Sequence, residues 1–155
     1  MEMYEEFESV CLGIFAFLKE KYDCESVTVE RDKFGIYISY RNATTAVRIS
    51  FEPRERGIFV LLSRLVDGKI PPYPIFVSSN TIIDSFYLDD VIMLRNPTRK
   101  IQQKSPERHT KSWFVKQLSI YANSLTEVAD DILKGNFEIF EDLERIVKER
   151  AGRVR

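Results

Sequence analysis

The sequence predicts an α+β fold, in which an N-terminal helix precedes a four-stranded antiparallel meander and C-terminal helices pack on the sheet. Residues 26–65 contain four runs in which apolar side chains recur at every second position, the period of a strand. Residues 3–22 and 113–134 repeat apolar side chains every three or four positions, the period of a helix. A chain of 155 residues is the length of one domain, so we expect residues 1–155 to form a single unit with a frayed tail at 151–155.

Short polar turns between the four runs allow the strands to be placed in register. The first turn is predicted to contain only Asp32 and Lys33, and an antiparallel hairpin must set apolar residues opposite one another. The register follows from one pair for each turn: Val29 with Ile36, Tyr40 with Thr45, and Glu52 with Gly57. The predicted strands are Ser26–Arg31, Phe34–Tyr40, Thr44–Glu52 and Gly57–Leu65.

The register sorts the side chains onto two unlike faces. One face, here called the inner face, is rich in β-branched and aromatic residues, which favour a buried pleated surface. Its rows are Val27–Ile38–Val47–Leu62, Val29–Ile36–Ile49–Val60 and Phe34–Phe51–Ile58. The amphipathic helix expected at 3–22 is the natural cover for this face.

The opposite, outer face is the predicted binding surface. It combines Tyr37, Arg48, Phe59 and Leu61, and the register sets Tyr37 beside Arg48, within reach of a cation–π contact. Aromatic residues and arginine on a rigid scaffold are typical anchors of protein interfaces. The competing interpretation is that residues 70–94 simply cover this face.

The segments after the sheet are predicted to be partly irregular. Three prolines in Pro71–Pro74 exclude a helix and a central strand, and indicate an extended loop. Residues 81–86 suit an added strand or a packing segment. Residues Leu88–Leu94 suit a short helix, and residues 97–111 form a polar loop without apolar period.

The C-terminal third is predicted to be helical. Ser112 can cap a helix over 113–134, and Gly135 suits a left-handed helix end. A second helix is expected from Phe137 to Arg150.

Composition and motif content argue against most kinds of chemistry. The net charge is −1, and no apolar run reaches the ~20 residues of a membrane span. Cys11 and Cys24 are expected to be free thiols. The single histidine, His109, falls in the polar loop, where we expect an exposed and non-catalytic side chain. The sequence therefore predicts no metal, no cofactor and no catalytic residue, in a cytoplasmic protein.

A basic segment at 95–116 supports an alternative function. Positive charge beside an aromatic ring can hold single-stranded nucleic acid through phosphate contacts and base stacking. The residues concerned are Arg95, Arg99, Lys100, Lys104, Arg108, Lys111 and Trp113. The alternative reading is a solvated loop with Trp113 in the core, and the near-zero net charge favours it.

The last 70 residues resemble known proteins. The segment Tyr121–Leu125, the run Ala129–Phe137 and the helix Phe140–Arg150 are similar to the C-termini of small uncharacterised bacterial proteins. Some of these are thought to act as immunity partners of toxins, and Leu88–Pro97 resembles a segment that precedes such tails. The resemblance implies a prokaryotic source and no catalytic residue. The leading hypothesis is a non-enzymatic interaction protein that binds a protein partner or itself, with nucleic-acid binding as the alternative and an enzyme third.

Overall fold

The computed structural model describes residues 2–55, 57–99 and 109–153, and its elements follow the predicted order. The helices and strands of this part of the chain are α1 (Glu2–Ile14), α2 (Phe17–Tyr22), β1 (Ser26–Arg31), β2 (Ile36–Arg41), β3 (Thr45–Glu52), β4 (Gly57–Arg64), β5 (Ser85–Tyr87), α3 (Leu88–Arg95), α4 (Lys111–Val128), α5 (Asp130–Leu133) and α6 (Ile139–Arg153).

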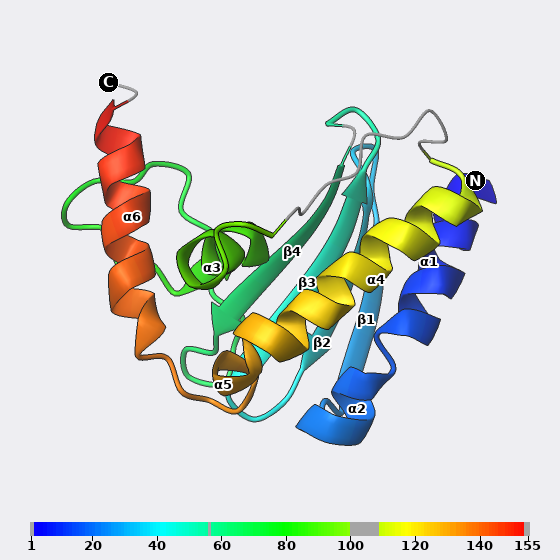
Figure 1. Cartoon of the computed structure of the whole chain (residues 1–155), viewed down its shortest axis with the longest axis horizontal. Coiled ribbons are helices and arrows are strands. Elements are labelled where there is room, and N and C mark those ends of the chain that lie inside the picture. Colours follow the sequence, from blue (N-terminus) through cyan, green and yellow to red (C-terminus); the bar gives the residue numbers. More distant parts are fainter. Residues whose placement is uncertain (1, 56, 100–108, 154–155) are drawn as a thin grey trace.

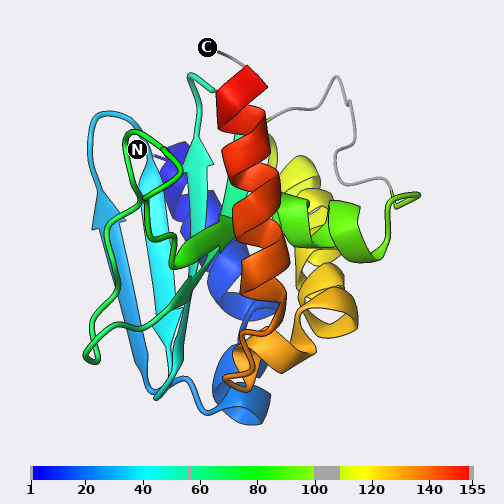
Figure 2. The same ribbon diagram turned by 90° about the vertical axis from the view of Figure 1, so that its left-hand side faces the viewer.

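The strands form one antiparallel sheet with helices on one side. The strand order is β1-β2-β3-β4-β5, so the predicted meander gains a short fifth strand beside β4 in the described residues. Helices α1 and α4 lie side by side across the inner face, while α3 lies beside β4 and α6 lies beyond α3 (Figure 1). Seen from the side, the sheet is on the left and the helices are on the right (Figure 2). The predicted α+β class is confirmed.

The β1–β2 register differs from the prediction by two residues, because Val29 pairs with Ile38. The turn contains four residues instead of two. The Asp32 carboxylate accepts hydrogen bonds from the backbone N–H of Phe34, at 2.7 Å, and of Gly35, at 3.0 Å. An aspartate that binds the backbone in this way stabilises the wider turn. Phe34 therefore lies in the turn and is 49% exposed, which makes its predicted place on the inner face wrong.

The β2–β3 register is also shifted by two residues, because Tyr40 pairs with Val47 instead of Thr45. The Asn42 side chain again determines the turn. Its Oδ1 accepts hydrogen bonds from the backbone N–H of Thr44 and Thr45, at 3.0 and 2.9 Å. Side-chain capping of this kind is not visible in the apolar pattern that gave the predicted register.

The division into two faces survives both shifts. Side chains alternate along a strand, so a shift of two residues returns each one to the same face. The β3–β4 register, with Glu52 opposite Gly57, is confirmed. The inner-face rows that result are Val27–Tyr40–Val47–Leu62, Val29–Ile38–Ile49–Val60 and Arg31–Ile36–Phe51–Ile58.

Both long helices expected from the sequence are interrupted. The segment 3–22 forms α1 and α2, and the segment 113–134 forms α4 and α5. Thr110, not Ser112, caps α4: its side-chain hydroxyl accepts a hydrogen bond from the Trp113 N–H at 3.2 Å. The inner face is covered by α1 together with α4, in line with the prediction that C-terminal helices pack on the sheet.

Gly135 has the left-handed backbone predicted for it, with φ of +91°. A Cβ at this position would lie 3.0 Å from the Thr44 hydroxyl, so both the conformation and the close approach require glycine. The final helix α6 continues to Arg153, three residues beyond the predicted end at Arg150, so the predicted fraying does not begin at 151.

Phe51 is the centre of the aromatic core. Its ring, at the end of β3, contacts five other rings with centroid separations of 5.0 to 6.4 Å: Tyr4, Phe7, His109, Trp113 and Phe114. These rings come from α1, from α4 and from the residues just before α4. His109 contacts Phe51 and is only partly exposed, so the prediction of an exposed side chain is wrong. Trp113 is buried, as the alternative reading of the basic segment expected.

Both cysteines are free, as predicted, and both are buried. Burial raises the pKa of Cys24 to about 11 and raises the pKa of Cys11 further. At neutral pH both are therefore uncharged thiols that fill the core.

We expect Phe51→Ala to lower the free energy of unfolding by about 3–5 kcal/mol, because the substitution leaves a cavity at the junction of β3, α1 and α4. Urea unfolding followed by circular dichroism measures this loss. Phe34→Ala is the matched control, since Phe34 is 49% exposed, and should cost less than about 1 kcal/mol. Equal losses in the two variants would contradict the central place of Phe51.

Candidate protein interface

Two adjacent rows on the outer face bring the predicted binding residues together. In one row Arg48 on β3 is opposite Leu61 on β4, which is opposite Tyr87 on β5. In the next row Ser50 lies between Tyr37 and Phe59. The structure thus places Tyr37, Arg48, Phe59 and Leu61 on one surface, and their role in binding stays a prediction.

Arg48 and Tyr37 form the cation–π pair anticipated from the sequence. The Arg48 guanidinium lies 4.3 Å from the centre of the Tyr37 ring. The contact is diagonal, because the shifted register sets Arg48 opposite Ser39. The Tyr37 hydroxyl donates a hydrogen bond to Asp32 Oδ1 at 3.3 Å, so the turn that fixes the register also holds the ring.

The ionisation of this surface is determined by those contacts. Backbone N–H groups, first that of Phe34, hold the pKa of Asp32 below its usual value. Burial and then the negative charge of Asp32 raise the pKa of Tyr37. Burial, followed by the nearby charge of Glu55, raises the pKa of Glu52. At neutral pH the surface therefore presents an arginine cation beside neutral phenol groups that can donate hydrogen bonds.

Two further tyrosines belong to the surface and were missed in the sequence. Tyr87 on β5 contacts Phe59 at 6.2 Å between ring centroids, and Tyr73 of the proline-rich loop contacts Tyr87 at 5.5 Å. The Pro71–Pro74 composition indicated only a loop, with no sign of where it runs. Together, Tyr37, Arg48, Phe59, Leu61, Tyr73 and Tyr87 are called the outer-face cluster.

The competing interpretation, that residues 70–94 cover the outer face, is correct for only part of that face. The segment 65–84, which joins β4 to β5, runs along the outer side of the sheet (Figure 2). The Arg41 guanidinium donates a hydrogen bond to the Gly68 carbonyl, and Tyr73 lies on Tyr87. Arg48 nevertheless stays exposed, and Tyr37, Phe59 and Leu61 are only partly buried.

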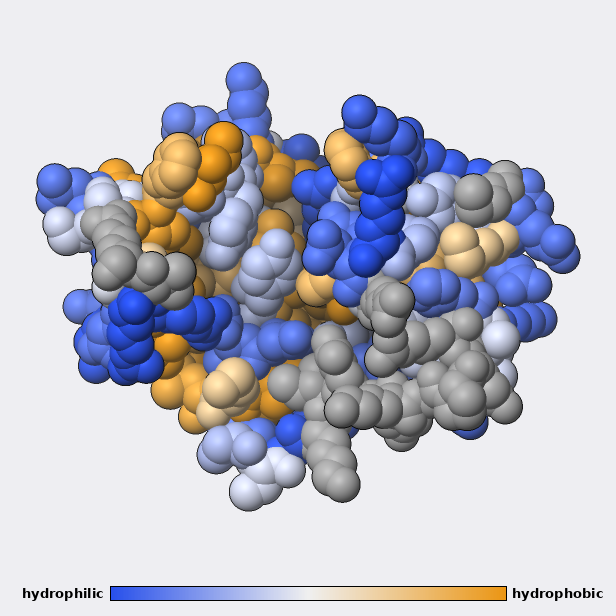
Figure 3. All heavy atoms as spheres, turned by 90° about the horizontal axis from the view of Figure 1, so that it is seen from above, coloured by the Kyte–Doolittle hydropathy of each residue, from blue (hydrophilic) through white to orange (hydrophobic). Residues whose placement is uncertain are grey.

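The covering segment itself carries exposed hydrophobic side chains. Ile75 is 90% exposed, Phe76 86% and Ile82 79%. Seen from above, hydrophobic atoms gather at the back left of the molecule, over this segment (Figure 3). We call these three residues the apolar loop. Protruding apolar side chains that cluster in this way commonly mark a site of contact with another molecule.

The apolar loop is attached to the rest of the protein on both sides. The Lys148 ammonium on α6 donates a hydrogen bond to the Ser79 carbonyl at 2.9 Å. The Arg64 guanidinium at the end of β4 forms an ion pair with Asp84 and lies 5.5 Å from the centre of the Phe140 ring. The apolar side chains are therefore presented on a supported segment.

The basic segment proposed for nucleic-acid binding is partly engaged within the protein. Arg99 forms an ion pair with Glu127, and Trp113 is buried. Lys111 lines the same surface pocket as the acidic residues at the start of α1. Lys100, Lys104 and Arg108 lie outside the described residues.

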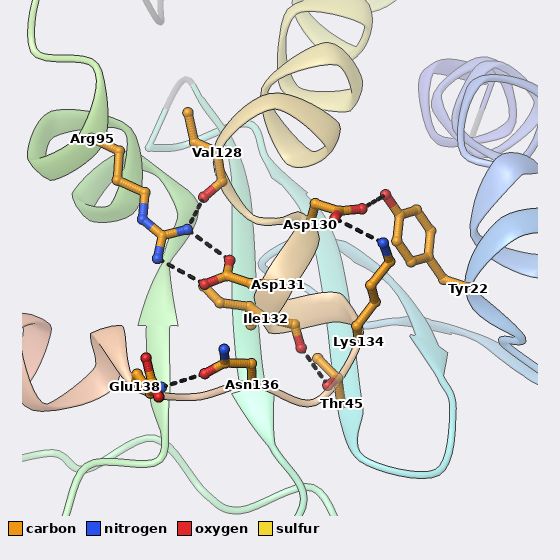
Figure 4. Close-up of polar contacts among 10 residues, drawn as sticks. All are labelled: Tyr22, Thr45, Arg95, Val128, Asp130, Asp131, Ile132, Lys134, Asn136 and Glu138. Carbon is orange, nitrogen blue, oxygen red and sulfur yellow. Dashed lines mark hydrogen bonds and ion pairs between the residues drawn. The ribbon is translucent and has the colours of Figure 1, made fainter.

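Arg95, the last residue of α3, binds both α5 and the end of α4. Its guanidinium donates hydrogen bonds to both carboxylate oxygens of Asp131, at 2.7 and 2.8 Å, and to the Val128 carbonyl at 2.6 Å (Figure 4). On the other side of α5, the Tyr22 hydroxyl donates to Asp130 Oδ1 at 2.6 Å. Through these two aspartates α5 is bound to α3 on one side and to α2 on the other.

Neither a metal centre nor a membrane span is found in the described part of the chain. Within residues 2–55, 57–99 and 109–153, no group of three or more His, Cys, Asp and Glu side chains is placed to hold a metal ion. None of the helices in these ranges is long and apolar enough to cross a bilayer.

No protein-family model matches this chain, and no curated protein or solved structure matches it either. The resemblance of the last 70 residues to small bacterial proteins therefore stays a prediction.

We expect Arg95→Met to lower the free energy of unfolding by about 1 kcal/mol at pH 7, a value reduced by the partial exposure of the pair. The hydrogen bonds from Arg95 hold the pKa of Asp131 below its usual value. A lowered folded-state pKa stabilises the protein above the unfolded pKa of about 3.9, and this contribution is lost as the pH falls through the folded value.

The difference between wild type and Arg95→Met should accordingly shrink between pH 5 and about pH 2, as measured by urea unfolding at each pH. Arg145→Met is the control, because Arg145 belongs to an exposed pair with Asp142 and should change stability by less than about 0.5 kcal/mol. A pH-independent difference would contradict the role assigned to the Arg95–Asp131 pair.

Proposed function

We propose that this protein is a non-enzymatic binding protein that docks another protein on its outer-face cluster and apolar loop. The single observation that carries the proposal is the exposure of Arg48 and of the apolar loop on one side of a sheet whose other side is filled by the core. A rigid surface that combines arginine, tyrosine and protruding apolar side chains has the composition of an interface centre.

The chemistry of the surface indicates the kind of partner. The phenol groups of Tyr73 and Tyr87 can donate hydrogen bonds while neutral, whereas the Tyr37 hydroxyl already donates to Asp32; Arg48 adds a cation with five N–H donors. The apolar loop requires a partner that buries Ile75 and Phe76. A protein surface with an apolar centre and carbonyl or carboxylate acceptors around it meets both requirements, and a peptide backbone supplies such acceptors.

A nucleic-acid partner is less well matched to the same surface. Phosphate binding requires several cations, whereas Arg48 has the carboxylates of Asp32 and Glu52 among its electrostatic neighbours. The net charge of −1 supplies no long-range attraction for a polyanion.

Arg48→Glu is expected to weaken partner binding by about 2 kcal/mol or more, which is roughly thirtyfold, because it replaces a central cation with an anion. The measurement is capture of proteins from the native host on immobilised wild type and variant, followed by mass spectrometry and titration of the captured protein. The circular dichroism spectrum of the variant should be unchanged, and because Arg48 is exposed, loss of its contacts with Tyr37 and the nearby carboxylates should lower the free energy of unfolding by no more than about 1 kcal/mol.

Lys19→Glu is the control, because Lys19 is an exposed cation on α2, away from the outer face. It should retain full binding. A double variant, Ile75→Ser with Phe76→Ser, tests the apolar loop without altering charge. Full capture by both the Arg48→Glu and the loop variants would remove this face as the binding surface.

A further inference from the structure

Strand β1 ends the sheet and leaves one of its two sides without a partner strand. It pairs with β2 alone in the strand order β1-β2-β3-β4-β5. The other end of the sheet is the three-residue β5, which is followed directly by α3. The six residues of β1 therefore provide the longer row of free backbone groups.

The phase of the β1–β2 ladder shows which backbone groups point outward. The Asp32 N–H donates to the Gly35 carbonyl at 3.0 Å, which makes this a hydrogen-bonded pair. Such pairs alternate along an antiparallel ladder, so Thr28 and Glu30 also turn their backbone groups toward β2. The N–H and C=O groups of Val27, Val29 and Arg31 then point away from the sheet.

These outward groups have no partner among the described residues. Within the ranges 2–55, 57–99 and 109–153, no hydrogen bond from the backbone of Val27, Val29 or Arg31 to a residue outside the sheet is found. Val29 is 39% exposed, and Thr28 is exposed as well. The edge therefore offers alternating donors and acceptors flanked by small β-branched side chains, which a second strand can match.

We infer that β1 pairs with β1 of a second copy of this chain, antiparallel and centred on Thr28. A two-fold axis perpendicular to the sheet requires residues of the same face to lie opposite one another. With Thr28 on the axis, Val27 of one copy is opposite Val29 of the other, and their outward backbone groups exchange hydrogen bonds. The inference goes beyond the proposed function, since it uses the edge of the sheet and not its outer face.

Charge complementarity selects this register over its neighbours. Centring on Thr28 brings Glu25, the residue just before β1, near Arg31 of the second copy, and the symmetry makes this contact twice. Both side chains are exposed, and Arg31 also forms an ion pair with Glu8 of α1 at 3.0 Å. A shift of the axis to Glu30 would set Glu30 against itself, and a shift to Val29 would lose the Glu25–Arg31 contact.

The consequence is one continuous sheet that runs through both copies, to which each copy contributes its five described strands. Because the axis is perpendicular to the sheet, both outer faces look in the same direction. Two copies of the outer-face cluster are then presented on one side of the dimer.

Sedimentation equilibrium of the full chain tests the inference, and we expect a monomer–dimer equilibrium. Val29→Pro removes an outward N–H while leaving the hydrogen bonds between β1 and β2, and should abolish the dimer. Val29→Thr is its control, because threonine keeps the N–H and the strand preference. Hydrogen exchange should show the Val27, Val29 and Arg31 amides protected in the wild-type dimer, and the Val27 and Arg31 amides exposed in Val29→Pro.

Charge reversal tests the register even if Val29→Pro fails to fold. Glu25→Arg or Arg31→Glu alone should weaken dimerisation roughly tenfold or more, because each creates two contacts of like charge. An equimolar mixture of the two variants should restore the dimer, since the mixed pair again sets opposite charges together. A wild-type monomer at about 1 mM protein, or a dimer indifferent to all these variants, would overturn the inference.

Discussion

The packing of five aromatic rings around Phe51 is the constraint on which the rest of the structure depends. Phe51 lies at the end of β3, next to the β3–β4 turn, and its neighbours come from α1, from α4 and from the residues before α4. This one contact region therefore fixes the two covering helices against the same strand. Because the inner face is filled in this way, any surface that the sheet offers to another molecule must be its outer face or its edge.

Two side chains in turns decide how the outer face is composed. The Asp32 and Asn42 oxygens each accept two backbone hydrogen bonds and so set the registers of the first two hairpins. The resulting registers move Tyr37 one row away from Arg48, yet the guanidinium still reaches the ring diagonally. Asp32 also binds the Tyr37 hydroxyl, so the residue that sets the turn also positions an aromatic side chain of the cluster.

The two proposed contact surfaces differ in physical character and complement one another. The outer-face cluster and apolar loop offer arginine, phenol and exposed aliphatic groups, which suit the irregular surface of another protein. The β1 edge offers only regular backbone donors and acceptors with small side chains, which suit another strand. Pairing through the edge would place two outer faces on one side of an assembly, so a partner with two matching sites would gain from the increase in effective concentration.

The sequence by itself determined the fold class, the assignment of each strand residue to a face, the β3–β4 register and the free state of the cysteines. These follow from periodicity, which depends only on backbone geometry and on the separation of apolar from polar side chains. Tertiary structure alone decided the first two registers, the interruption of both long helices and the packing of His109 against Phe51. It also decided the addition of Tyr73 and Tyr87 to the surface and the use of Arg95 as an internal ion-pair partner. Each of these depends on a contact between residues distant in sequence or on a side-chain cap within a turn. Neither kind of interaction changes the spacing of apolar residues, so neither can be predicted from periodicity.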